Sequence, residues 1–107
     1  MVKVHKVERS IQDLEVAVRG IVLRPKPEPR RLLDITMRVL AEEDRLESML
    51  EKAETKERKE IDEALKRLKD IKRSLLRVYF SSLLLGTFKF EYVPAIASLG
   101  RRGRWSP

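Results

Sequence analysis

The stretch IDEALKRLKDIKRSLLRVYFSSLLL, residues 61–85, carries an apolar or small side chain at alternating steps of three and four residues. Residues at that spacing lie along one face of a helix. The pattern therefore predicts a long amphipathic helix over residues 60–86, with Gly86 as its stop. Its apolar stripe consists of Ile61, Ala64, Leu68, Ile71, Leu75, Val78, Ser82 and Leu85.

A second stripe precedes the first and predicts another helix over residues 31–54. It consists of Leu32, Ile35, Val39, Glu42, Leu46, Met49 and Ala53, and only Glu42 interrupts it. The two stripes are out of phase, because the residue seven positions beyond Ala53 is Glu60 and not Ile61. This slip falls in the charged segment ETKERKE, residues 54–60, and favours a turn there. Because the segment contains no Gly or Pro, one continuous helix remains the alternative.

The distribution of charge favours pairing of these two helices within one chain. Residues 32–60 hold nine acidic and six basic side chains, whereas residues 61–86 hold three acidic and six basic ones. Two such helices lying side by side place complementary charges on their flanks. The sequence thus predicts a mainly α fold built on a long antiparallel, coiled-coil-like helical hairpin.

The N-terminal segment, residues 1–23, fits two local structures. One series follows helical spacing and favours a short helix that stops at Gly20. Another alternates as in a strand, and its β-branched residues keep the strand open as an alternative. The helical series is Val7, Ile11, Leu14 and Val18, and the alternating one is Leu14, Val16 and Val18. The next segment, RPKPEPR, residues 24–30, is a Pro-rich linker whose prolines predict a stiff, extended connector.

The sequence changes character after Gly86. Aromatic and charged residues alternate in TFKFEYV, residues 87–93, which predicts a short strand with its aromatic side chains on one face. Residues 100–107, GRRGRWSP, are expected to form a basic flexible tail. Residues 1–99 are then a single helical domain, as the length of 107 residues also suggests.

The composition excludes several classes of site. The chain has no Cys and one His, so it lacks the residues for a disulfide framework, a thiol nucleophile or a structural zinc site. Its four glycines form no phosphate-binding loop motif. We therefore expect no catalytic residue, no metal and no cofactor. The chain is predicted not to be an enzyme and to act on no small-molecule substrate.

The sequence also bears on where the protein resides. The N-terminus shows no apolar leader, and the apolar stretch at residues 75–86 is too short for a membrane span of about 20 residues. We therefore expect a cytoplasmic protein with no membrane partner. The chain has no Asn or Cys and abundant Lys, Arg and Glu, a composition typical of thermophilic proteins.

A net charge of +7 favours association with a polyanion such as RNA or DNA. The helix predicted over residues 60–86 carries a basic stripe that can contact phosphates, and the tail adds three arginines and a tryptophan that can stack on a base. The candidate nucleic-acid contacts are Lys66, Lys69, Lys72, Arg73, Arg77, Arg101, Arg102, Arg104 and Trp105.

Apolar residues near the end of the same helix exceed what a two-helix hairpin can bury. The candidate protein-interface residues are Tyr79, Phe80, Leu84, Phe88, Phe90 and Tyr92. Two functions follow from the two surfaces. The first is a nucleic-acid-associated protein, a small structural subunit of a ribonucleoprotein or DNA-processing complex. The alternative is a helical protein-interaction subunit of a multiprotein, for example replication-complex-like, assembly or a homodimer, without direct nucleic-acid contact.

Overall fold

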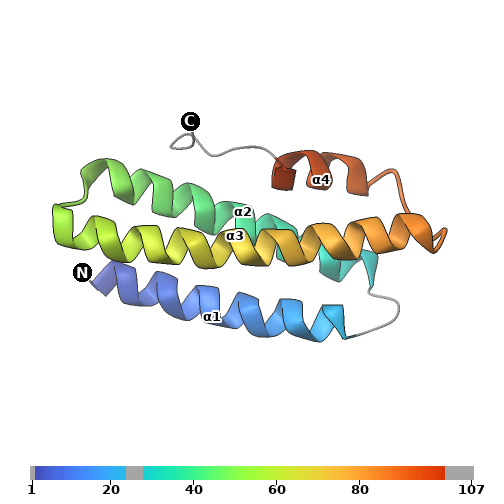
Figure 1. The fold of residues 1–107 in the computed structure, drawn as a ribbon, viewed down its shortest axis with the longest axis horizontal. Coiled ribbons are helices and arrows are strands. Elements are labelled where there is room, and N and C mark those ends of the chain that lie inside the picture. Colours follow the sequence, from blue (N-terminus) through green and yellow to red (C-terminus); the bar gives the residue numbers. More distant parts are fainter. Residues whose placement is uncertain (1, 24–27, 101–107) are drawn as a thin grey trace.

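The structure, a computed structural model, describes the backbone of residues 2–23 and 28–100 and the side chains of residues 7–23 and 28–100. Four helices follow one another along this part of the chain: α1 (Val2–Val22), α2 (Pro29–Lys52), α3 (Thr55–Leu84) and α4 (Tyr92–Gly100) (Figure 1). No strand occurs within these two ranges. The prediction of a mainly α fold is confirmed.

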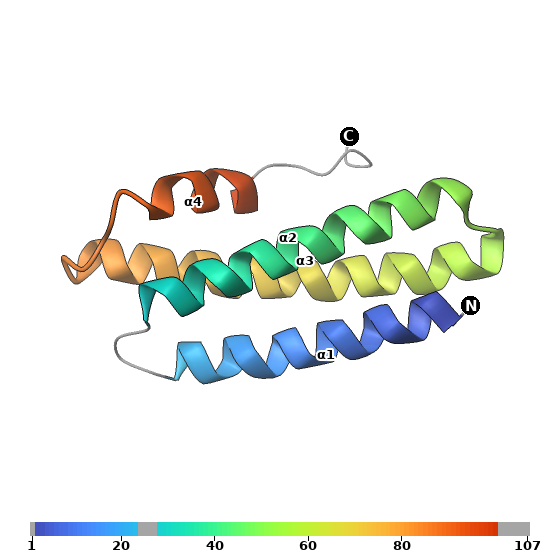
Figure 2. The same ribbon diagram turned by 180° about the vertical axis from the view of Figure 1, so that it is seen from behind.

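Helices α1, α2 and α3 lie side by side as an elongated bundle with extents of 47 × 27 × 17 Å (Figures 1 and 2). Successive helices run in opposite directions, so α1 and α3 are parallel and α2 is antiparallel to both. The short helix α4 packs on α2 and α3, near the end of the bundle where α3 ends. The expected hairpin is therefore only part of the architecture, because α1 and α4 both pack against the α2–α3 pair.

Helix α1 decides between the two local structures that fit the N-terminal segment. Its buried side chains are those of the helical series, namely Val7, Ile11, Leu14, Val18 and Ile21. Val16, which the strand alternation needs on the same face as Leu14 and Val18, is 62% exposed. The strand alternative is therefore wrong. The expected stop at Gly20 is also wrong, since the helix continues to Val22.

Helix α2 begins at Pro29, the last proline of the linker. A proline is well tolerated in the first helical turn, where a backbone N–H has no partner inside the helix. Glu28 precedes it in an extended conformation. Residues 24–27 of the linker lie outside the described part of the chain.

Only Ala53 and Glu54 separate α2 from α3, and both have extended backbones. The turn thus lies at the start of the charged segment 54–60, and α3 begins at Thr55 and not at residue 60 as predicted. The Lys, Arg and Glu side chains of this segment are strong helix formers, and most of them are exposed on the surface. These propensities explain why the helix extends almost to the turn.

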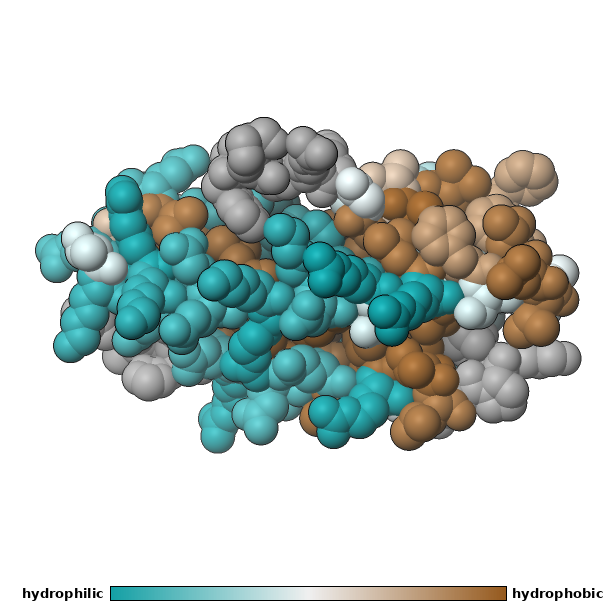
Figure 3. Space-filling model, in the orientation of Figure 1, coloured by the Kyte–Doolittle hydropathy of each residue, from teal (hydrophilic) through white to brown (hydrophobic). Residues whose placement is uncertain are grey.

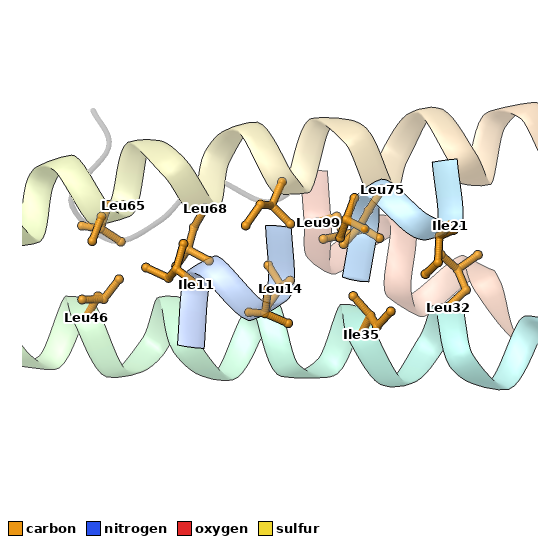
Figure 4. Packing of buried hydrophobic residues seen from close by; sticks show 14 of the residues in the cluster. Ile11, Leu14, Ile21, Leu32, Ile35, Leu46, Leu65, Leu68, Leu75 and Leu99 are labelled. Carbon is orange, nitrogen blue, oxygen red and sulfur yellow. The ribbon is translucent and has the colours of Figure 1, made fainter. Parts of the chain in front are cut away.

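The core is a continuous layer of aliphatic side chains between the helices (Figure 4). Ile11 of α1, for example, lies close to Leu46 of α2 and Leu68 of α3. Glu42 interrupts the apolar stripe of α2, yet only 8% of it is exposed. Its Oε1 atom accepts a hydrogen bond from Ser10 Oγ of α1 at 3.1 Å, which compensates part of the cost of burying the carboxylate.

Gly86 ends helix α3, as predicted. Its φ angle of 75° lies in the left-handed region that favours glycine. Two backbone hydrogen bonds close the helix end: Gly86 N–H donates to Leu83 O at 3.3 Å, and Thr87 N–H donates to Ser82 O at 2.9 Å. These are the paired bonds with which helices commonly end on a glycine.

The predicted strand over residues 87–93 is wrong. Residues 87–91 form an irregular connection, and Tyr92 already belongs to α4. The aromatic residues do not share a face, because Tyr92 is buried, Phe88 is half-buried and Phe90 is 92% exposed. In a strand they would point the same way, whereas here Tyr92 faces the bundle and Phe90 faces solvent.

An aromatic cluster attaches α4 to the bundle. The ring centroids of Tyr79 and Tyr92 are 4.9 Å apart, and those of Phe88 and Tyr92 are 5.8 Å apart, both in edge-to-face arrangements. The Tyr79 hydroxyl lies 2.7 Å from Thr36 Oγ1 of α2. Burial is the main cause that raises the pKa of Tyr79 above its ordinary value. The cluster thus connects three helices through both packing and a buried hydrogen bond.

Candidate functional site

The outward side of α3 carries a row of four exposed cations, Lys66, Lys69, Arg73 and Arg77, here named the basic face. The row lies opposite the buried stripe of Ile61, Leu68 and Leu75, because the helix turns by about 100° per residue. Four acidic residues are also exposed on the same helix, namely Glu60, Asp62, Glu63 and Asp70. The structure therefore brings four of the nine candidate nucleic-acid residues together on one side of one rigid helix.

Lys72 does not belong to this face, which corrects the sequence prediction. Only 7% of it is exposed, and its Nζ atom lies 2.8 Å from Glu43 Oε2 of α2. The reason is its position in the buried series of α3, which consists of Leu65, Leu68, Lys72, Leu75 and Tyr79. That spacing was visible in the sequence, but the positive charge of Lys72 suggested exposure instead.

A second ion pair joins α1 to α3. The guanidinium of Arg67 contacts the Glu15 carboxylate, and both side chains are partly exposed. Together with the Lys72–Glu43 pair, it places a basic residue of α3 against an acidic residue on each neighbouring long helix. These two cations stabilise the bundle and are not part of the basic face.

The candidate protein-interface residues separate into two groups. Tyr79 and Tyr92 are fully buried and Phe88 is half-buried, so these three belong to the aromatic cluster and not to an exposed interface. Phe80, Leu84 and Phe90 are 51%, 88% and 92% exposed. Sequence periodicity could not separate these groups, because the position of α4 decides which aromatic residues are covered.

Three more apolar side chains join the exposed group. We name the combined set the apolar end; its members are Phe80, Leu83, Leu84, Leu85, Phe90 and Val93. In Figure 3, hydrophobic side chains gather at the end of the molecule where α3 meets α4, whereas hydrophilic side chains predominate toward the α2–α3 turn. The face seen in Figure 3 is thus divided along the long axis of the bundle.

Two shallow hollows flank α1. The larger, of about 480 Å³, is lined by Ala17, Glu28, Arg30, Arg31, Asp34, Ile35 and Arg38. The smaller, of about 280 Å³, is lined by Glu15, Val18, Arg19, Val22, Leu23, Asp70, Ile71 and Ser74. Each contains both acidic and basic side chains. Among the described residues, no group of three or more His, Asp or Glu side chains is placed to hold a metal ion.

The tail residues Arg101, Arg102, Arg104 and Trp105 lie outside the described residues. Within the described helices, none is long and apolar enough to span a bilayer. Comparison of the chain with known protein families, with curated proteins and with solved structures finds no match. Two surfaces of the described part of the chain are candidates for binding a partner, namely the basic face and the apolar end.

Proposed function

We propose that the chain is a non-enzymatic, nucleic-acid-associated protein, a small structural subunit of a ribonucleoprotein or DNA-processing complex. The observation that carries the proposal is the basic face of α3, where four cations are exposed on one side of a straight helix. From Lys66 to Arg77 the face extends about 16 Å, the axial length of roughly four or five phosphates on one strand of a duplex.

The chemistry of this face suits binding without sequence specificity. Lysine and arginine side chains contact phosphate oxygens, and such contacts position a protein on nucleic acid but carry no sequence information directly. Each phosphate neutralised releases counterions, so the affinity falls with rising salt. If all four cations contact phosphates, raising the salt from about 50 to 200 mM should weaken binding about a hundredfold.

The test is a fluorescence-polarisation titration of labelled single-stranded RNA, duplex RNA and duplex DNA at these two salt concentrations. The double variant Lys66→Glu/Arg73→Glu should weaken binding by more than about tenfold and reduce the salt dependence. The control is Lys52→Glu/Lys56→Glu, which changes the net charge equally at exposed positions near the α2–α3 turn. Equal losses in both variants would mean that bulk charge, and not the basic face, attracts the nucleic acid.

A chain ending at residue 99 measures the part of the affinity that the basic tail contributes. No binding of any of the three nucleic acids by the full chain at the lower salt concentration would refute the proposal for the isolated protein.

A further inference from the structure

The apolar end exposes a cluster of large nonpolar side chains. Phe80 and Phe90 alone expose roughly 200–350 Å², given that an aromatic side chain has about 150–250 Å². Leu83, Leu84 and Leu85 are each more than half exposed and enlarge the patch further. The largest apolar patch on a typical monomer is about 300–600 Å², and patches of that size often mark binding sites.

The shape of this end is a protrusion. The last turns of α3 project beyond the ends of α1 and α2, and the connection to α4 caps them (Figures 1 and 2). Leu84, the last residue of α3, and Phe90, in the connection to α4, are the two most exposed apolar side chains among the described residues. A protruding apolar tip is suited to insertion into a soft apolar medium, and it provides less area for a flat contact between two rigid surfaces.

The charges around the tip are mainly positive. Residues 71–93 include four basic side chains and one acidic side chain, the exposed Glu91. Lys72 is buried beside Glu43, which leaves Arg73, Arg77 and Lys89 exposed. At the opposite end of the bundle, residues 42–63 include ten acidic and five basic side chains. The apolar end is therefore flanked by positive charge, and the excess of negative charge lies at the far end.

The exposed apolar side chains, the protruding shape and the positive charge together indicate the chemistry of the partner. A second copy of the chain docking tip to tip would bring two surfaces of net positive charge together, because Arg77 and Lys89 outnumber Glu91 on each, and like net charges oppose that contact. An anionic lipid surface instead offers hydrocarbon for the apolar side chains and negative headgroups for the cations. We propose that the apolar end inserts into the surface of an anionic lipid bilayer, with Leu84 and Phe90 at the acyl boundary and Arg77 and Lys89 among the headgroups.

The spacing along α3 agrees with the dimensions of a bilayer surface. Arg77 precedes Leu84 by two helical turns on the same face, a separation of about 10 Å. The headgroup layer on each side of a bilayer is roughly 5–8 Å thick. In a tilted helix, a long arginine side chain therefore reaches the headgroups while Leu84 lies at the acyl boundary. Such shallow insertion requires no membrane-spanning helix.

The experiment is co-sedimentation of the full chain with vesicles of phosphatidylcholine alone and of equal parts phosphatidylcholine and phosphatidylglycerol. Binding should occur on the anionic vesicles and be at least about tenfold weaker on the zwitterionic ones. The variant Leu84→Ser/Phe90→Ser should lose at least about tenfold in vesicle binding, because two large side chains no longer leave water. Circular dichroism should show unchanged helix content, since both side chains are exposed.

Two controls test whether the effect of Leu84→Ser/Phe90→Ser is specific to vesicle binding by the apolar end. Val16→Ser removes an exposed apolar side chain from α1, which does not contact α4, and should leave vesicle binding unchanged. Leu84→Ser/Phe90→Ser should retain its nucleic-acid affinity, because the basic face is untouched. A loss of vesicle binding is therefore distinguishable from a loss of nucleic-acid binding, because each is measured separately.

Three outcomes overturn the inference. The first is that the full chain does not sediment with anionic vesicles. The second is equal vesicle binding by the parent chain and Leu84→Ser/Phe90→Ser, which indicates adsorption by charge alone. The third is a concentration-dependent dimer in the absence of lipid that Leu84→Ser/Phe90→Ser converts to a monomer, which assigns the apolar end to a second copy. Analytical ultracentrifugation of both proteins provides this last result.

Discussion

Thr36 and Tyr79 place two hydroxyl groups inside an otherwise apolar core. Thr36 Oγ1 donates its single proton to Leu32 O at 2.8 Å, so the Tyr79 hydroxyl must donate to Thr36. The two partners are therefore not equivalent. Removing the acceptor leaves a buried phenol without a partner, whereas removing the phenol leaves Thr36 with its bond to Leu32.

This asymmetry predicts unequal effects on the free energy of unfolding. Thr36→Val should cost about 1–3 kcal/mol, and Tyr79→Phe about 0.5–1.5 kcal/mol. The double variant should cost less than the sum of the two, because no unpaired hydroxyl then remains. Urea denaturation of the four proteins measures this double-mutant cycle. Strictly additive losses would contradict the interaction itself, and a larger loss for Tyr79→Phe than for Thr36→Val would contradict the assigned direction of the hydrogen bond.

The buried phenol of Tyr79 also makes stability depend on alkaline pH. Burial raises its pKa above the ordinary value of 10.0. Above about pH 10 the unfolded chain releases its phenolic protons first and binds fewer protons than the folded chain. The free energy of unfolding should therefore fall as the pH rises through this range. Tyr79→Phe should lose less stability than the parent chain between about pH 9.5 and 11, measured by urea denaturation.

Lys72 and Glu43 form an ion pair whose side chains are only 9% and 15% exposed. Lys72→Met should destabilise the fold by about 2–4 kcal/mol, because it leaves a nearly buried carboxylate without its cation. Lys72→Met/Glu43→Leu should regain most of that loss. Thermal unfolding followed by circular dichroism tests both variants. A neutral effect of Lys72→Met would show that the ion pair with Glu43 does not stabilise the fold.

At the scale of the elements, two glycines predict opposite effects of the same substitution. Gly20 lies within α1 with no atom within 4 Å of an added Cβ, so Gly20→Ala should stabilise the protein by about 0.5–1 kcal/mol. A Cβ added at Gly86 would also meet no atom within 4 Å, but the φ of 75° at this position strains any residue that has a Cβ. Gly86→Ala should therefore destabilise by about 1–2 kcal/mol. Chemical denaturation of the two variants provides the comparison, and equal signs would contradict the conformations described here.

The long helices could be predicted from the sequence because their apolar spacing persists over many turns. Ile61, Leu68 and Leu75 are all buried as their spacing implies. Helix α4 could not be predicted in this way, since TFKFEYV alternates like a strand. Its conformation is set by Tyr92, which packs against Tyr79, and Tyr79 lies 13 positions earlier in the chain. Local periodicity contains no information about such a contact.

The candidate functional residues could likewise be predicted only in part from the sequence. Exposure of Lys66, Lys69, Arg73 and Arg77 follows from their position opposite the stripe of α3, and the structure agrees. The charge of Lys72 predicts exposure, whereas its spacing predicts the burial that the structure shows. The position of α4 decides which apolar residues at this end are covered. It leaves Phe80, Leu84 and Phe90 exposed, and Tyr79 and Tyr92 buried. Only the folded arrangement distinguishes these residues.

At the scale of the whole molecule, the bundle is longer than a sphere of the same mass. Its Cα radius of gyration is 14.5 Å, compared with about 13 Å for an average compact domain of this length. Small-angle X-ray scattering of the dilute protein without lipid should therefore give an elongated particle with the mass of one chain. A particle of twice that mass would favour contact between two copies.

The two-residue connection between α2 and α3 has a consequence for how quickly the fold forms. Ala53 and Glu54 bring two long helices together with almost no loop to close, and contacts between segments near in sequence form fast. Helical bundles dominated by such contacts fold in microseconds to milliseconds. We expect closure of α2 on α3 to precede the docking of α1, because contacts between α1 and α3, such as Glu15 with Arg67, join residues 52 positions apart. A newly made chain would thus expose its apolar stripes only briefly, which limits aggregation before the native state is reached.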